Sequence, residues 1–369
     1  MSEKHHELRI DHVDVAAFTI PTDLPESDGT LEWHSTTLVT VDATCGETNG
    51  FGYTYADTAT ARLIKDLLVP LVRGRDPMDV TATWQAMRNA VRNLGGPGIS
   101  AMAISAVDIA LWDLKGKLLN VPLVLLLGRV RDALPIYGSG GFTSYTDLQL
   151  RRQMCGWANQ GIPRVKMKVG RDPQRDLHRV GVTREAIGPS TELFVDANSA
   201  YDRKQALWYM EKFAEMDVTW MEQPLPPEDV DGMRLLRDRA PAKMEIADGE
   251  YGYDLPYFRR KLEANAVDVL MADATRCGGI TGFLQVGALC EAFQIPLSSH
   301  CAPALHVHVG CAVRPLRHGE YFHDHVRIEQ MLLDGGLKPR GGALFPDLTR
   351  PGMGLEFKCA DAERYRRKI

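Results

Sequence analysis

The chain has 369 residues, of which 44% are hydrophobic and 25% are charged, and its formal net charge is -5. This length is sufficient for two domains, and the composition is that of a globular protein. The acidic balance gives no general basic surface, and no apolar run reaches the ~18 residues that span a bilayer. We therefore expect neither nucleic acid nor a membrane as a partner.

The seven cysteines are scattered along the chain and form no Cys-x-x-Cys pair. This usage argues against a disulfide framework or a zinc knuckle and is typical of a reducing compartment. The start of the chain, MSEKHHELRI, also lacks the apolar core of a secretory signal. The sequence therefore predicts a cytoplasmic protein.

The first third of the chain predicts an α+β domain, residues 1–132. Residues 8–20 and 34–44 alternate like antiparallel strands, with the polar stretch 21–33 expected as a loop between them. Residues 50–55 form a third strand candidate, and helical patterns follow from 59 to 94. A Gly-Gly-Pro-Gly break at 95–98 precedes an apolar helix, 100–120, whose small residues suit close packing.

Residues 133–345 have a different sequence pattern, in which short β-like runs alternate with helical stretches. The runs are 135–140, 164–169, 192–198, 219–224, 244–250, 267–273, 295–300 and 319–323. No phosphate-binding glycine-rich turn follows the first run, so a (β/α) barrel is favoured over a nucleotide-binding doubly wound sheet. Residues 346–369 extend beyond a final barrel helix and are expected to pack back on the first domain.

An ionisable residue stands at the end of most of these runs, and successive members are 20 to 28 residues apart. They are Lys168, Asp196, Glu222, Glu250, Asp273, His300 and Glu320. One βα unit of a barrel is roughly that long, and the carboxyl ends of all barrel strands converge on the face that carries active sites. The spacing therefore predicts that these side chains meet.

Three consecutive runs end in the carboxylates Asp196, Glu222 and Glu250. Three converging carboxylates repel one another unless a cation lies between them, and oxygen ligands favour Mg²⁺ over Zn²⁺. Asp248 precedes Glu250 by two residues and faces the same side; we prefer Glu250 as the ligand. Asn198, two residues after Asp196, is expected to support the metal or the substrate.

Two further pairs are candidates for proton transfer. Asp273 beside His300 would orient the imidazole and raise its basicity. Lys166 and Lys168 share one face of their strand. There, burial, a second ammonium and a nearby cation would lower the pKa of Lys168 enough for it to act as a base. A Schiff-base lysine is the rival role, but that chemistry needs no cluster of three carboxylates.

These motifs, in this order, resemble the mandelate racemase group of the enolase superfamily. RVKMKVG (164–170) is similar to its Lys-x-Lys motif, and FVDANSAY, WMEQP and ADGEYGYD to its three metal-ligand segments. DATRCGGIT and SSHCAP resemble its Asp–His dyad, LRHGEYF carries Glu320 where the family has an electrophilic acid, and residues 103–128 resemble a capping-domain signature. The resemblance implies a modified (β/α)7β TIM-type barrel with an α+β capping domain, and an even-numbered homo-oligomer.

The resemblance also implies an activity: Mg²⁺-dependent loss of the proton α to a carboxylate of a small molecule, through an enediolate. Lys168 and His300 would be the two bases, tuned by Lys166 and Asp273, and Glu320 would donate a hydrogen bond if protonated. Dehydration of an acid sugar is the first expectation, racemisation or epimerisation of a 2-hydroxy acid the alternative, and a ligand-binding barrel without turnover the less favoured class. The capping segments 21–34 and 49–56 offer Trp33, His34, Tyr53 and Tyr55 as substrate contacts.

Overall fold

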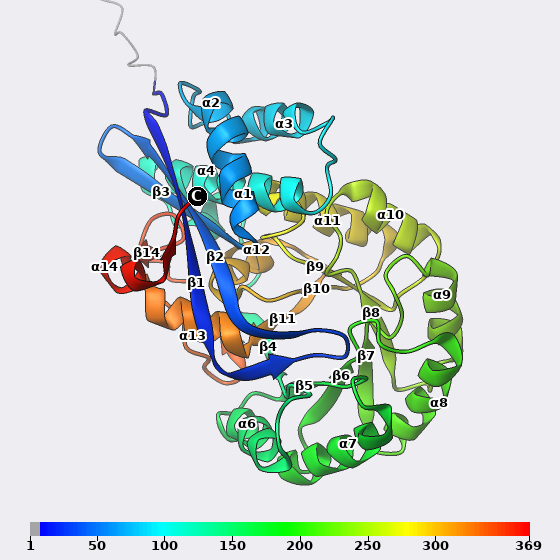
Figure 1. Ribbon diagram of the computed structural model, residues 1–369. Helices are drawn as coiled ribbons and strands as arrows, with labels where there is room; N and C mark the ends of the chain where they lie inside the picture. The colour runs from blue at the N-terminus through cyan, green and yellow to red at the C-terminus, as the bar shows by residue number, and fades with distance from the viewer. Residues whose placement is uncertain (1–7) are drawn as a thin grey trace, which may run out of the picture.

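The computed structural model describes residues 8–369 and shows a capping domain seated on a barrel (Figure 1). Residues 1–7, which include most of the leading segment considered for a signal and the start of the predicted capping domain, lie outside the described part. Within residues 8–369, no helix is long and apolar enough to cross a membrane.

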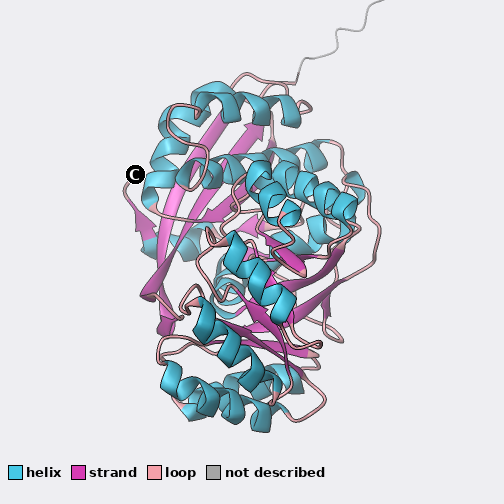
Figure 2. Cartoon of the chain, turned by 90° about the vertical axis from the view of Figure 1, so that its right-hand side faces the viewer, coloured by secondary structure: helices cyan, strands magenta, loops and turns pink. Residues whose placement is uncertain are grey.

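The capping sheet is antiparallel and is built from β1 (His12–Ser27), β2 (Glu32–Cys45) and β3 (Thr48–Tyr55). The stretch 21–33 is not the predicted loop, because β1 and β2 continue to the pair Ser27–Glu32 with an irregularity between Pro21 and Glu26. The prediction was wrong because the polar residues of this arm face the barrel as well as water; Glu26 and Ser27 are buried. The hairpin crosses the barrel mouth in Figure 1, and its long strands run down beside the barrel in Figure 2.

Helices cover the capping sheet in the predicted region. They are α1 (Thr58–Leu63), the π-helix η1 (Ile64–Leu68), α2 (Val69–Val72), α3 (Val80–Ala90) and α4 (Ile99–Leu118). The close contact between α4 and β3 depends on glycine: a Cβ at Gly52 would stand 2.2 Å from the carbonyl oxygen of Ala106. This contact packs the small-residue helix predicted at 100–120 against the sheet.

The eight predicted runs form eight parallel strands that close into a barrel, because β11 pairs with β4 as well as β10. The strands are β4 (Leu134–Gly140), β5 (Arg164–Lys168), β6 (Glu192–Asp196), β7 (Val218–Glu222), β8 (Glu245–Asp248), β9 (Val269–Ala272), β10 (Leu297–Ser299) and β11 (Leu316–Phe322). The connecting helices are α6 (Asp147–Asn159), α7 (Pro173–Ile187), α8 (Arg203–Ala214), α9 (Val230–Arg239), α10 (Leu255–Glu263), α11 (Gly279–Phe293) and α12 (Pro303–Ala312). A further helix, α13 (His323–Leu332), follows β11 directly. The closed parallel barrel with its separate cap confirms the predicted fold class.

The two parts are joined at the amino end of α11. Ser105 of α4 accepts hydrogen bonds from the backbone of Gly278 and Gly279 at 3.0 Å each. Asp108, one turn along α4, accepts from the backbone of Thr281 at 2.9 Å. The unpaired N–H groups at the start of a helix are thus satisfied by side chains of the capping domain, which anchors the cap close to the loop after β9.

The end of the chain returns to the capping domain. β15 (Arg366–Arg367) pairs with β1 through Phe18 and Ala17, and the backbone of Met353 donates to Asp113 of α4 at 2.6 Å. Short elements precede this return: α5 (Leu123–Leu126), β12 (Leu333–Asp334), β13 (Ala343–Leu344), β14 (Glu356–Phe357), α14 (Cys359–Ala362) and η2 (Glu363–Tyr365). The domain division at 132/133 and 345/346 stays a prediction.

Candidate active site

Strand register places the predicted side chains at one end of the barrel. Lys168 of β5 is paired with Asp196 of β6, and Asp196 is paired with Glu222 of β7. Glu250 lies two residues beyond the end of β8, after Gly249, whose φ of 141° is open to glycine but strained for other residues. Parallel strands in register therefore bring the three acids to the barrel mouth, where barrel active sites lie.

The carboxylates of Asp196, Glu222 and Glu250 offer oxygens that lie within 4.8 Å of one another, and all three residues are buried. Asp248 takes a different partner, because its Oδ2 forms a buried ion pair with Lys261 of α10. Three buried acids whose oxygens converge form an all-oxygen donor set that fits Mg²⁺. These residues therefore suit the predicted cation, with Asp248 outside the set.

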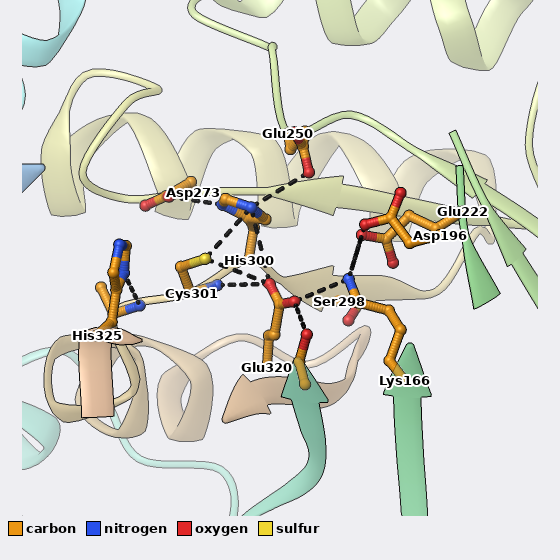
Figure 3. A network of polar contacts seen from close by, with 12 residues as sticks. Lys166, Asp196, Glu222, Glu250, Asp273, Ser298, His300, Cys301, Glu320 and His325 are labelled. Atoms are coloured by element: carbon orange, nitrogen blue, oxygen red, sulfur yellow. Dashed lines mark hydrogen bonds and ion pairs between the residues drawn. The ribbon is translucent and has the colours of Figure 1, made fainter. Parts of the chain in front are cut away.

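Both lysines of β5 contact these acids, and Figure 3 shows Lys166 pointing toward them. Lys166 Nζ lies 2.8 Å from Glu320 Oε1 and 3.4 Å from Asp196 Oδ2, and it contacts Glu222. Lys168 Nζ lies 2.6 Å from Asp196 Oδ2. Both ammonium groups thus balance the negative charge of the carboxylate cluster.

The pKa of Lys168 shifts opposite to the expected direction in the protein without a bound cation. Burial is the largest influence and lowers this pKa, as does the repulsion of Lys166, but the combined attraction of Asp196, Glu250 and Glu320 outweighs both, so that the pKa is raised. The predicted lowering depends on burial, on the second lysine and on a bound cation acting together. A divalent cation held by the carboxylates offsets their charge, which is the condition under which the lysine pKa falls.

His300 stands at the end of β10 with both ring nitrogens engaged (Figure 3). Nδ1 lies 2.9 Å from Asp273 Oδ2, and Nε2 lies 3.2 Å from Glu250 Oε2. Burial opposes protonation of the ring, but the neighbouring Cys301, Glu250 and Glu320 and the hydrogen bond to Asp273 raise the pKa of His300 well above its usual value. His300 therefore flanks the metal-ligand set on the Glu250 side, while Lys168 contacts Asp196.

Asp273 is itself held in place. Its Oδ1 accepts hydrogen bonds from the backbone N–H of Thr275 at 2.7 Å and from the Thr275 hydroxyl at 2.8 Å. Burial raises the pKa of Asp273, but the hydrogen bond and charge of His300 reverse this and lower it. The pair is thus an ionised carboxylate that orients an imidazole.

Glu320 is ionised, which differs from the protonated state considered from the sequence. Burial raises its pKa, but the charges of Lys166 and His300 lower it well below its usual value. Its oxygens accept hydrogen bonds from the Ser139 hydroxyl at 2.5 Å and from the backbone of Cys301 at 3.0 Å. A donor role for Glu320 stays a prediction for the substrate-bound site.

A cavity of about 410 Å³ lies between the barrel mouth and the capping hairpin. Its lining includes Asp28, Leu31, Trp33, Ser35, Thr36, Thr37, Tyr55, Asp57, Lys168, Asn198, Glu250, Tyr251, Arg276, His300, Cys301, Glu320, Phe322 and His325. Asn198 carries a buried side-chain oxygen without a hydrogen-bond partner among residues 8–369. Its backbone carbonyl accepts from the Thr30 hydroxyl at 3.2 Å, which fastens the hairpin tip to the barrel.

Of the predicted capping contacts, Trp33 and Tyr55 line the cavity, whereas His34 and Tyr53 do not. Neighbouring residues of a strand point to opposite faces, so the His34 side chain is 72% exposed on the outer side. Tyr53 is buried in the core, where its hydroxyl donates to Glu329 at 2.8 Å, and Tyr55, two residues on, reaches the cavity instead. The structure therefore places neither His34 nor Tyr53 at this cavity.

Several lining residues were not identified from the sequence. Tyr251 follows Glu250 directly, Cys301 follows His300, and Arg276 lies three residues after Asp273, with its guanidinium 3.8 Å from that carboxylate. Proximity to a strand end was the available signal for all three. His325 had no such signal, because α13 carries it to the cavity.

The fold and the site together define a metal-dependent barrel enzyme whose proton-transfer groups flank a cluster of three carboxylates. Two family models match the chain: "Mandelate racemase / muconate lactonizing enzyme, N-terminal domain" over residues 13–128 and "Enolase C-terminal domain-like" over residues 149–362. The chain belongs to the mandelate racemase/muconate lactonizing enzyme family of the enolase superfamily. It is an enzyme, and its cofactor is Mg²⁺.

Known proteins align over nearly the whole chain. The 3,6-anhydro-alpha-L-galactonate cycloisomerase of Streptomyces coelicolor is 32% identical, covering 94% of this chain and 96% of that protein. A mandelate racemase/muconate lactonizing enzyme-like protein from Rubrobacter xylanophilus has 52% identity and a TM-score of 0.95, covering 97% of this chain and 100% of that one. L-talarate/galactarate dehydratase from Salmonella typhimurium LT2, liganded with Mg and L-lyxarohydroxamate, has 27% identity and a TM-score of 0.89, covering 100% and 95%.

Proposed function

We propose that this enzyme removes the proton α to the carboxylate of an acid sugar and eliminates water, giving a 2-keto-3-deoxy acid. The observation that supports this proposal is the placement of two proton-transfer groups on either flank of one metal-ligand set. Lys168 contacts Asp196 at 2.6 Å, His300 contacts Glu250 at 3.2 Å, and both line the same cavity. A substrate carbon held between them is addressed from two sides.

Asp196, Glu222 and Glu250 would hold the cation. When bound, Mg²⁺ supplies positive charge at the substrate carboxylate, which stabilises the enediolate that forms as the α-proton leaves. Lys166 adds a second positive charge beside this carboxylate and keeps Glu320 close, at 2.8 Å. Lys168 Nζ takes the α-proton, a transfer that a positioned base accelerates by about 10²–10⁴-fold.

His300 completes the elimination. Its Nε2 carries the proton that is delivered to the β-hydroxyl, the carbon–oxygen bond breaks, and water leaves; the resulting enol becomes the 2-keto acid. Asp273 stabilises the imidazolium. Its Oδ2 holds Nδ1 at 2.9 Å, which keeps Nδ1 turned away from the substrate. The similarity to the Salmonella dehydratase supports this outcome over others of the superfamily.

The charges of the cavity wall favour a monocarboxylate, an aldonic acid, over a dicarboxylate. Among the described lining residues, the Lys and Arg side chains are those of Lys168 and Arg276, and both contact acids of the site. The capping domain contributes Asp28 and Asp57, whose carboxylates accept backbone hydrogen bonds, and the apolar Trp33. Among residues 8–369, the lining offers a second substrate carboxylate no basic side chain that is free of an acidic neighbour, and placing like charges together is costly.

A panel of aldonic and aldaric acids with Mg²⁺ tests the proposal, using a carbonyl reagent to detect 2-keto product. We expect turnover of one or more aldonates, with kcat/KM at least about tenfold above that for the matching aldarate. Lack of keto product from every acid would contradict dehydration. Preference for an aldarate would contradict the proposed selectivity for a monocarboxylate.

Racemisation or epimerisation is the second candidate, and the same two-sided placement of Lys168 and His300 favours it. In that reaction, one group takes the α-proton and the other returns a proton to the opposite face. Incubation in D₂O distinguishes the two: exchange of the α-hydrogen without keto product indicates the racemase. Keto product that appears together with exchange indicates the dehydratase.

The expected even-numbered homo-oligomer also stays a proposal, supported by the family resemblance. Light scattering coupled to size exclusion measures the mass in solution directly. A mass of 41.0 kDa, that of one chain, would contradict it.

A further inference from the structure

Beside the carboxylate set, three metal-binding atoms of different chemistry surround one point of the cavity wall: His300 Nε2, Cys301 Sγ and Glu320 Oε2 (Figure 3). Cys301 Sγ lies 3.3 Å from His300 Nε2 and 3.4 Å from Glu320 Oε2, and Nε2 lies 3.7 Å from the same oxygen. All three residues are buried and line the cavity. The proposed reaction gives the thiol no part.

The edges of this triangle match a tetrahedral zinc site. Zinc binds sulfur at about 2.3 Å and imidazole nitrogen or carboxylate oxygen at about 2.0–2.2 Å, which places tetrahedral ligand atoms about 3.3–3.7 Å apart. Zinc would hold the sulfur about 3.5–3.7 Å from the other two ligand atoms and those two about 3.3–3.5 Å apart, and the observed separations of 3.3 and 3.4 Å to the sulfur and 3.7 Å between nitrogen and oxygen are each within about 0.2 Å of these values. A small cation therefore fits with little movement of the side chains, and its fourth position would face the cavity.

The backbone is shaped to bring the thiol to this point. Successive residues of an extended strand point to opposite sides, which would separate Cys301 from His300. Instead Cys301 has φ 52° and Ala302 has φ 39°, in the left-handed region between the end of β10 and α12. This turn places Sγ on the same side as the imidazole.

The outer contacts are also those of a metal site. Histidine ligands usually donate their second ring N–H to a carboxylate, which fixes the tautomer and the ring orientation. Here Asp273 holds Nδ1 at 2.9 Å and leaves Nε2 directed at the cluster. Glu320 is oriented in turn by the Ser139 hydroxyl, at 2.5 Å, and by the backbone N–H of Cys301, at 3.0 Å.

We propose that His300, Cys301 and Glu320 form a second cation site, selective for Zn²⁺ or a similarly thiophilic ion, whose occupation inhibits the Mg²⁺-loaded enzyme. A thiolate and an imidazole select zinc, whereas the all-oxygen set of Asp196 and its partners suits magnesium. On binding, the S–H bond of Cys301 and the N–H bond at His300 Nε2 break, S–Zn and N–Zn bonds form, and both protons pass to solvent. Binding follows from the geometry alone, while inhibition rests on the proposed role of His300 in proton transfer.

The experiment uses Mg²⁺-saturated wild-type enzyme and adds Co²⁺ as a spectroscopic substitute for Zn²⁺. We expect a near-ultraviolet thiolate-to-cobalt charge-transfer band that saturates at one Co²⁺ per chain and disappears when Zn²⁺ is added. Equilibrium dialysis should show that bound Mg²⁺ is retained. Absence of the band in the wild type, or release of one Mg²⁺ per Zn²⁺ bound, would overturn the second site.

Variants locate the ligand. C301S should lose the band and weaken Zn²⁺ binding by more than about 100-fold, beyond the 10–100-fold typical of losing an outer contact. The matched control is C359S, at an exposed cysteine that belongs to no group of three potential metal ligands among residues 8–369. This variant should keep both the cobalt band and the affinity for Zn²⁺. C301A serves if C301S does not fold by circular dichroism; a band that persists without Cys301 would overturn the assignment.

Activity is measured in parallel. Zn²⁺ should inhibit turnover over the same concentrations that bleach the cobalt band, and removing it with a chelator followed by fresh Mg²⁺ should restore turnover. Zn²⁺ that displaces the cobalt band without inhibiting turnover would overturn the inhibitory role alone. Failure of the proposed dehydration is detected separately, as lack of keto product in zinc-free enzyme.

Discussion

Asp273 Oδ2 lies 2.9 Å from His300 Nδ1, and this contact decides which ring nitrogen faces the cavity. The two residues follow neighbouring strands, β9 and β10, and Asp273 is fixed by two hydrogen bonds from Thr275. The orientation of the imidazole is therefore set by the adjacent strand end. Nε2 is left to serve the substrate or a bound cation.

D273N tests this relationship. The amide cannot stabilise the imidazolium, so we expect kcat to fall by about 10²–10⁴-fold, the range that general acid–base catalysis contributes. Asp273 is not among the three metal-ligand acids, so the Mg²⁺-dependent rise in melting temperature should remain. Loss of that rise in D273N would show that the dyad and the metal ligands are not separable.

Mg²⁺ should raise the melting temperature of the wild type, because a ligand that binds the folded state stabilises it. D196N should abolish the rise, since it removes one of the three ligands. The matched control is D248N: it breaks the buried pair with Lys261, which costs about 3–5 kcal/mol and lowers the baseline, yet the rise with Mg²⁺ should persist. Differential scanning fluorimetry over a Mg²⁺ series measures both, and a D248N protein without the rise would place Asp248 in the metal site.

W33A should raise KM about tenfold, equivalent to about 1.4 kcal/mol of substrate contact, with a smaller change in kcat. Trp33 lines the cavity, whereas the adjacent His34 points to solvent. H34A is therefore the control and should behave as the wild type in steady-state kinetics. Equal effects of the two substitutions would mean that the hairpin, not the tryptophan, governs binding.

Glu329 predicts a pH dependence of stability outside the metal site. Burial raises its pKa from 4.5 to about 8. Between these values the folded state holds a proton that the unfolded state has released, so stability falls as pH rises, by up to about 1.4 kcal/mol per unit. The E329Q variant lacks this titration, and its unfolding free energy in urea should fall less than that of the wild type from pH 5 to pH 8. Parallel curves would exclude Glu329 as the source.

The barrel and its polar strand ends were predictable because two local rules determine them. Short apolar runs at the spacing of a βα unit indicate parallel strands, and the residue that ends each run lies at the shared mouth, as Lys168, Asp196 and Glu222 do. The extended hairpin was not predictable in the same way. Its polar residues resemble those of a loop, and the barrel surface that they cover lies more than a hundred residues away in the chain, as the contact of Thr30 with Asn198 shows.

The sequence by itself determined the order of the strands and the chemical type of each group at the barrel mouth, since both depend on local spacing and residue identity. The tertiary structure decided which groups touch. It assigned Asp248 to Lys261, turned His34 and Tyr53 away from the cavity, and brought Cys301 beside His300. It also decided the direction of the Lys168 pKa shift, because that depends on the balance of all nearby charges, whose separations only the folded chain defines.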